Sequence, residues 1–186
     1  MNRKTAFLIC STVLLSTNIS ILTRIYADDK QITHTNKIID GSEESLMNET
    51  IESTQPNHSV ICNQNGGTVT LDQNTLVKSG DSINTDGTNS IVYTTGSSFT
   101  KIDQSDLQST SKGSSGIVAN EKAMVYANDS TIMTSNDSSN GLEAVSSGQI
   151  IANQMDITTQ GNQSAAVNVK QNDGSISLTN SILSTD

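Results

Sequence analysis

The sequence contains no tryptophan, a single proline and few aromatic side chains, which make up 3% of the residues. Hydrophobic residues make up 33%, whereas roughly 45–50% is usual for globular chains. So few large apolar side chains argue against a large three-dimensional core. The 186 residues have room for one ordinary domain, or for a short repeat array with an extra segment at one end.

Arginine is missing from the chain beyond Arg24, since Arg3 and Arg24 are the only two. Together with Lys4 they lie at positions 1–27, whereas all 19 acidic residues lie further along. Subtracting these three from the 10 basic residues leaves 7 against 19 acidic residues, a formal net charge of −12. Such a surface repels phosphate backbones and has no basic patch, so we expect no binding to nucleic acid.

The N-terminal segment, residues 1–27, has the features of an export signal. Arg3 and Lys4 give a positively charged start, and residues 7–22 form an apolar stretch interrupted by Ser, Thr and Asn. Cleavage is expected after Ala27. The alternative, an uncleaved membrane anchor, needs about 20 mainly apolar residues, and this stretch is shorter. The chain is therefore expected to be secreted or held at the cell surface.

Cysteine and histidine are also scarce. Cys62 is the only cysteine beyond the predicted signal and so has no partner for an internal disulfide. A small buried side chain is expected there, with a reactive or intermolecular thiol as the alternative. The separation of His34 and His58 along the chain matches no closed zinc site. The sequence predicts no metal site, no cofactor and no catalytic residue.

An internal repeat organises the second half of the chain. Residues 116–140 align without a gap with residues 141–165, matching for example Gly116 with Gly141. One aliphatic column of this alignment runs through Leu76, Leu107, Ile132, Ile157 and Ile182. The first step along it spans 31 positions and each later step spans 25, so the period is 25. An extra residue in the final repeat would put Leu183 in place of Ile182, and the sequence leaves this open.

Within each repeat, apolar residues alternate over short stretches, as in Ile117 and Ala119 or Val125 and Ala127. Alternation at period two is typical of a strand with one buried face. Clusters of Gly, Asn, Asp and Ser separate these stretches and suit tight turns. The repeat therefore predicts three short strands per coil and an all-β fold, a right-handed parallel β-helix of about five coils. Equivalent residues of successive coils should stack about 4.8 Å apart.

Two stacked columns have a predicted structural role. The aliphatic column of Leu76 to Ile182 should form an inward ladder. A second column consists of Asp72, Asp103, Asn128 and Asn153. These Asx side chains are expected to stabilise a corner by bonding to backbone groups. The hydroxyls of Ser109, Thr134 and Thr159 suggest a further ladder.

The predicted organisation has three parts. Residues 1–27 are the signal peptide, residues 28–57 a polar extension or cap, and residues 58–186 the β-helix repeats, incomplete at the C-terminus. Apolar residues between Ile32 and Ile51 either form a strand that caps the first coil or belong to a disordered segment. The six extra residues of the first step fall near residues 80–89 and predict a projecting loop.

The repeats resemble the passenger domains of bacterial autotransporters of the pertactin-like type. The resemblance rests on GIVAN (116–120), STIMTSNDSSNGLEA (130–144) and MDITTQGNQSAAV (155–167), and it covers roughly residues 59–186. It implies export through a signal peptide and display or release at the surface through a C-terminal β-barrel. The sequence departs from the family's pattern in having no barrel after the repeats.

Polysaccharide-degrading β-helix enzymes are the catalytic alternative. Their chemistry needs clustered carboxylates, usually with Arg, Lys or His. Asp103 with Asp106, or Asp81 with Asp86, are pairs that such an enzyme could use, and the first is the pair to test. Both pairs lie at predicted turns, however, and no arginine is available as a base. A noncatalytic module is therefore the preferred hypothesis.

We expect this module to act in adhesion or host-cell interaction, with an extracellular or host-surface ligand as its partner. The alternative is an inactive N-terminal fragment of a larger passenger, for which a barrel translocator would be the partner. The strand edges around Ile176, Leu178 and Leu183 also predict self-association through the uncapped C-terminal coil.

Overall fold

The computed structural model describes residues 32–82, 87–171 and 173–186. Strands, turns and bends are the only structure in these ranges. Among the same residues, no helix is long and apolar enough to cross a membrane. The predicted signal peptide, residues 1–27, lies outside the described residues.

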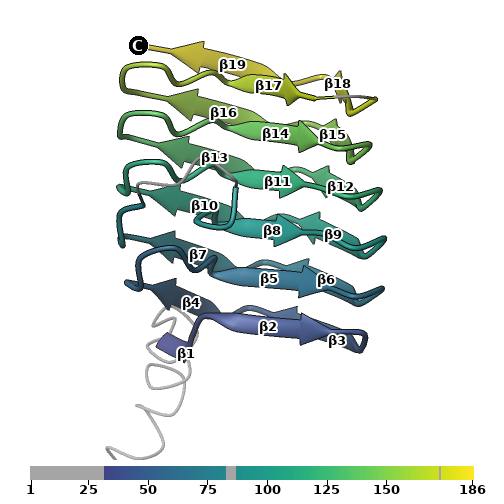
Figure 1. Ribbon diagram of the computed structural model, residues 1–186. Coiled ribbons are helices and arrows are strands. Elements are labelled where there is room, and N and C mark those ends of the chain that lie inside the picture. Colours follow the sequence, from purple (N-terminus) through teal and green to yellow (C-terminus); the bar gives the residue numbers. More distant parts are fainter. Residues whose placement is uncertain (1–31, 83–86, 172) are drawn as a thin grey trace, which may run out of the picture. The chain divides into compact units, whose positions relative to one another are not determined.

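The strands form three sheets (Figure 1). Sheet A contains β1 (Ile32–Thr35), β4 (Thr50–Ser53), β7 (Thr75–Lys78), β10 (Asp106–Ser109), β13 (Thr131–Thr134), β16 (Asp156–Thr159) and β19 (Ile182–Thr185). Sheet B contains β2 (Lys37–Asp40), β5 (Ile61–Gln64), β8 (Val92–Thr94), β11 (Ile117–Ala119), β14 (Leu142–Val145) and β17 (Val167–Lys170). Sheet C contains β3 (Glu43–Met47), β6 (Thr68–Asp72), β9 (Phe99–Asp103), β12 (Met124–Asn128), β15 (Gln149–Asn153) and β18 (Ser175–Thr179).

Each coil consists of one strand from sheet B, one from sheet C and one from sheet A, in that order. Every strand pairs in parallel with the equivalent strand of the next coil, for example β10 with β13 and β12 with β15. Six such coils stack from β2–β4 to β17–β19 (Figure 1). The fold is thus a right-handed parallel β-helix, which confirms the fold class predicted from the 25-residue repeat.

The first coil lies where the sequence suggested only an extension or cap. Its strands β2, β3 and β4 pair in register with β5, β6 and β7. Leu46 pairs with Leu71 and Ile51 with Leu76, so two of its inward positions follow the 25-residue step. The stack therefore has one coil more than the five expected.

The core lies inside the coils and consists mainly of the inward-facing aliphatic side chains of the three sheets. Inward positions alternate with outward ones along each strand, as the burial of β12 and β13 shows. In sheet A the inward column contains Ile51, Leu76, Leu107, Ile132 and Ile157, each at most 1% exposed. This regular stacking explains how a chain poor in hydrophobic residues builds a dry core.

The last member of the predicted inward column needs correction. Ile157 pairs with Leu183, whereas Ile182 pairs with Asp156, points outward and is 67% exposed. The pairing of β14 with β17 keeps the regular step of the repeat, whereas that of β15 with β18 is one position longer. The final coil therefore gains one residue in the turn between β17 and β18, which shifts the alternation so that Leu183 faces inward.

The inserted loop between β7 and β8 packs back onto the solenoid at its described end. Gly87 has a φ of +86°, and a Cβ atom there would lie 2.9 Å from Cγ1 of Val118. Val118 points outward from sheet B and is nevertheless fully buried. The loop thus returns over the outer face of sheet B. Its expected projecting tip, residues 83–86, lies outside the described residues.

Candidate binding site

The predicted Asx column stands at the corner where sheet C leads into sheet A. Asp72, Asp103, Asn128 and Asn153 pair in that order at the ends of β6, β9, β12 and β15. The Asn128 Nδ2 donates to Oδ1 of Asp103 (2.9 Å), and the Asn153 Nδ2 donates to Oδ1 of Asn128 (2.8 Å). The side chains of Asp103, Asn128 and Asn153 therefore bond to one another between coils, and not to the corner backbone as expected.

The backbone of this corner is held by a hydroxyl column two residues further on. The backbone N–H of Ser105 donates to Oγ of Ser130 (2.9 Å), and that of Met155 donates to Oγ of Ser181 (3.1 Å). Sequence reasoning missed this column. Its signal is a serine at the second position after the Asx residue, in 103–105 and 128–130. Because the Ser130 hydroxyl also donates to the Asn128 carbonyl (2.8 Å), it satisfies one buried and one partly buried backbone group.

The suggested third ladder forms no bonds between coils. The Thr134 hydroxyl donates to the Ser139 carbonyl of its own coil (2.9 Å). The Ser109 hydroxyl accepts from the N–H of Ser111 (3.1 Å). The Thr134 and Ser109 hydroxyls thus stabilise the turns that leave sheet A, each within its own coil, whereas the Thr159 hydroxyl is buried without a hydrogen-bond partner among the described residues.

The two carboxylates of the enzymatic alternative stand on opposite sides of the corner between sheets C and A. Asp103 accepts from Asn128 and lies 3.7 Å from the Lys101 Nζ. Asp106 accepts from the Thr131 hydroxyl (2.5 Å) and from the Gln108 amide (2.6 Å). Each carboxylate thus has a role within the stack. The described residues also contain no group of three or more His, Cys, Asp and Glu side chains placed to hold a metal ion.

Lys78 is fully buried at the root of the inserted loop. Its ammonium group donates to the carbonyl of Gln55 (3.0 Å) and to that of Gly80 (2.5 Å). Burial lowers the pKa of Lys78 to about 8, although the Asp81 carboxylate opposes the shift. Ser53 and Ser109 occupy the same position in the adjacent coils. The lysine therefore ties the loop to the turn of the coil below.

Glu143 is buried on the outer side of sheet B, at 2% exposure. Its Oε2 accepts from the Ser115 hydroxyl (2.9 Å) and the Asn140 amide (2.7 Å), and its Oε1 lies 2.8 Å from the Lys170 Nζ. A carboxylate with three such partners holds neighbouring coils together.

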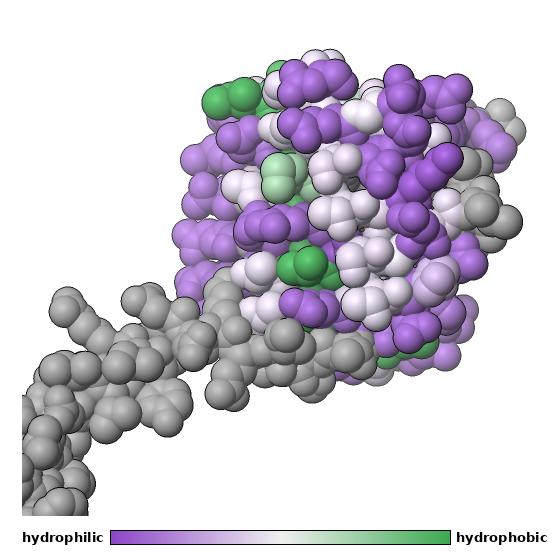
Figure 2. All heavy atoms as spheres, turned by 90° about the vertical axis from the view of Figure 1, so that its left-hand side faces the viewer, coloured by the Kyte–Doolittle hydropathy of each residue, from purple (hydrophilic) through white to green (hydrophobic). Residues whose placement is uncertain are grey.

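The turns between sheets A and B present a mainly polar surface. Figure 2 shows the side that lies at the left of Figure 1, where these turns stack. Hydrophilic and weakly polar residues cover most of this side, and the hydrophobic residues on it are separated from one another. A candidate site with a continuous apolar floor therefore has to be sought on another face.

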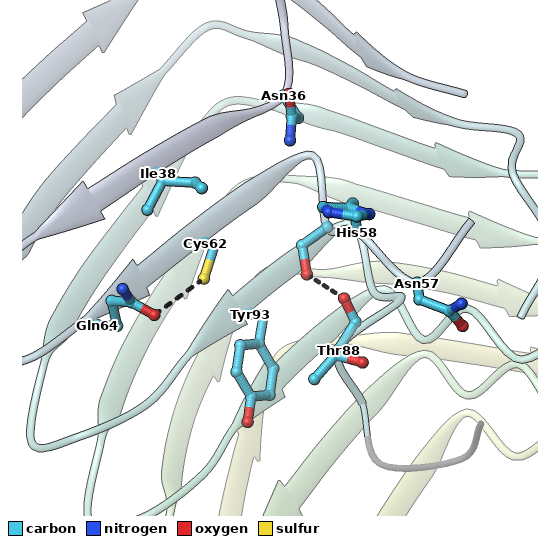
Figure 3. A pocket seen from close by; sticks show the side chains of 9 residues that line it. Asn36, Ile38, Asn57, His58, Cys62, Gln64, Thr88 and Tyr93 are labelled. Atoms are coloured by element: carbon cyan, nitrogen blue, oxygen red, sulfur yellow. Dashed lines mark hydrogen bonds between the residues drawn. The ribbon is translucent and has the colours of Figure 1, made fainter. Parts of the chain in front are cut away.

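Such a floor lies on the outer face of sheet B, in a cavity of about 210 Å³ (Figure 3). Ile38, Cys62 and Tyr93 occupy paired outward positions on β2, β5 and β8. The rim of the cavity carries polar side chains from loops and strand ends: Asn36, Asn57, His58, Ser59, Gln64 and Thr88. Three coils and the returning end of the inserted loop therefore meet at this cavity.

Hydrogen bonds fix the walls of the cavity. The Ser59 hydroxyl donates to the carbonyl of Thr88 (2.7 Å), which fastens the end of the loop to the second coil. The Tyr93 hydroxyl accepts from the Asn120 amide (2.9 Å). His58 Nδ1 donates to the Pro56 carbonyl (2.9 Å).

Cys62 lies half-buried in this floor and points away from the core. Burial, and secondarily the Asp40 carboxylate, raise the pKa of the thiol. The thiol therefore stays protonated at neutral pH and is a poor nucleophile. It donates weakly to Oε1 of Gln64 (3.8 Å). Cys62 thus contributes apolar surface to the cavity, a role that its isolated position in the sequence could not indicate.

The comparisons with known proteins add no further assignment to these sites. No family model, no curated protein and no solved structure matches this chain.

Proposed function

We propose that the chain is a noncatalytic, exported β-helix module that binds a ligand outside the cell, as an adhesive passenger domain of an autotransporter does. The cavity on sheet B carries this proposal, because an inserted loop folds back to complete it. The acidic and amide side chains that enzymatic chemistry would use are instead bonded between coils.

The test is binding of the full chain, recovered after export, to immobilised extracellular-matrix proteins and to an array of cell-surface glycans. We expect saturable binding to at least one member of these panels. Absence of binding to all of them would overturn the adhesive function. Mass spectrometry of the exported chain should find a new N-terminus at Asp28, and an unprocessed chain that stays inside the cell would overturn the proposed export.

We also infer that the sixth coil self-associates. Leu183 and Val169 are 47% and 51% exposed, and β17, β18 and β19 each pair on one side only. Unpaired strand edges with apolar side chains favour pairing with another chain. The same coil would accept a further coil of a longer passenger that ends in a barrel. Sedimentation velocity should show a concentration-dependent dimer that L183E weakens, and a monomer at all concentrations would contradict this.

A further inference from the structure

The chemistry of the cavity on sheet B points to the ligand class that it fits. We infer that it binds a single neutral sugar ring, as found at the end of a glycan chain. This inference rests on the proposed function, because it names the ligand of the same site.

The floor provides the apolar half of the recognition. Ile38, Cys62 and Tyr93 lie side by side on neighbouring strands. One face of a sugar ring consists mainly of C–H groups, which pack against aromatic and aliphatic side chains. The Tyr93 ring is fixed through the bond that its hydroxyl accepts from Asn120, so it is preorganised for such packing.

The rim provides the polar half. The side chains of Asn36 and Gln64 border the floor, and their amides offer both donors and acceptors, whereas the Asn57 side chain points away from it (Figure 3). In the described part of the chain, the bond that the Gln64 amide forms uses its oxygen, which accepts from the Cys62 thiol. Amide donors therefore remain for ligand hydroxyls.

Other ligand classes fit this arrangement less well. An anion would meet no lysine or arginine in the lining, within a chain of formal net charge −9. A purely apolar molecule would leave the rim amides desolvated and unpaired, which costs free energy. The 210 Å³ volume is below the roughly 300–1,000 Å³ of sites for drug-sized ligands. One ring fits this space, and an extended chain does not.

Two exposed residues of the first coil give a matched pair of variants. Ile38, in the floor, is 58% exposed, and Met47, on sheet C of the same coil, is 61% exposed. I38D places a carboxylate in the cavity, whereas M47D places one on a different face. Neither substitution removes a core side chain, so both variants should fold, which circular dichroism can verify.

The experiment uses the full chain with free glucose, galactose, N-acetylglucosamine and the acidic N-acetylneuraminic acid. Ligand-observed saturation-transfer NMR measures binding, and peptide mapping measures the alkylation rate of Cys62. At a sugar concentration about ten times the Kd, occupancy should slow alkylation about tenfold. We expect binding and protection by at least one neutral sugar, both lost in I38D and both kept in M47D.

Three results would overturn the inference: no binding by any neutral sugar, equal binding by I38D, or equal protection of Cys62 by the acidic sugar. These results are distinguishable from failure of the proposed function. A chain that binds matrix proteins or glycans on the array equally well with and without I38D remains an adhesive module, but its site is elsewhere.

Discussion

The fifth and sixth coils carry the same alternation of inward and outward residues, yet only the fifth coil buries its inward apolar side chains fully. Ile157 in β16 is fully buried, while its partner Leu183 in β19 is 47% exposed. Ala144 in β14 is likewise buried, while its partner Val169 is 51% exposed. A coil of this fold is thus too thin to cover its own apolar face, and most of its stabilisation comes from the coils on either side.

The largest difference between the two coils should come from equivalent glycines in the turns before β15 and β18. A Cβ atom on Gly148 would lie 2.0 Å from the Ala119 carbonyl oxygen, so the backbone would have to move. On Gly174 it would lie 3.1 Å from the Ala144 oxygen, a tight contact that a small shift relieves. We expect G148A to lower the free energy of unfolding by about 4 kcal/mol or more, and G174A by about 1 kcal/mol.

Urea unfolding followed by circular dichroism measures both variants. Equal unfolding midpoints for the two variants would show that the packing of coils four and five is no tighter than that of coils five and six.

A second comparison concerns aliphatic side chains of the inward column. I132A leaves a cavity between two coils and should cost about 3 kcal/mol. L183A removes a side chain that is already half in water, so it should cost less than about 1 kcal/mol. The same urea titration decides the point, and a cost for L183A that matches I132A would mean that a further layer covers the sixth coil in solution.

Lys78 shows the effect of burying a charged side chain in an interior coil, which no described residue of the sixth coil does. Its pKa is about 8 in the folded chain and about 10.5 when unfolded. Between these values the unfolded chain binds more protons, so stability should rise with pH from about 8 to 10.5, by up to about 3 kcal/mol. Below about pH 8 the lysine is charged in both the folded and the unfolded chain, so it does not make the free energy of unfolding depend on pH.

Urea titrations at several pH values should show this rise in the native chain and its loss in K78M, which keeps the length of the side chain. If the free energy of unfolding depended on pH identically in the two proteins, the lowered pKa of Lys78 in the folded chain would be contradicted.

The smallest effect is expected for the serine column at the corner between sheets C and A. S130A leaves the buried N–H of Ser105 without its acceptor and should cost about 1–2 kcal/mol. S181A should cost about half as much, because Ser181 is partly exposed and water can replace its hydroxyl. Thermal unfolding of the two variants measures the difference, and a larger loss for S181A would reverse the predicted order.

The repeat made much of the fold predictable. Pairs such as Gly116 with Gly141 show the period directly, and alternation within each unit gives the strands. The first coil is hard to recognise in the sequence because its strand β2 departs from the repeat. Ile39 pairs with the polar Asn63, and the two are one residue closer in sequence than the 25-residue step. Leu46 and Ile51, by contrast, keep the 25-residue step, and Ile51 continues the aliphatic column one coil below Leu76.

The cavity could not be predicted from the repeat. Its floor consists of outward residues, which are not constrained by the core and so follow no period. Ile38, Cys62 and Tyr93 differ in size and chemistry although they share one column. The end of the inserted loop at Thr88 reaches the site by folding back, and a loop path has no signature in the spacing of apolar residues.

Hydrogen exchange followed by mass spectrometry tests most directly whether stacking supplies the stability. The account predicts the slowest exchange in β10, β13 and β16, which have a partner strand on both sides, and much faster exchange in β19, which has one. The comparison uses the amides that donate to the preceding coil, which are those of Asp106, Thr131, Asp156 and Ile182. All four are hydrogen-bonded in the same way, so bonding alone would protect them equally. Uniform protection from β10 to β19 would contradict the claim that each coil depends on its neighbours.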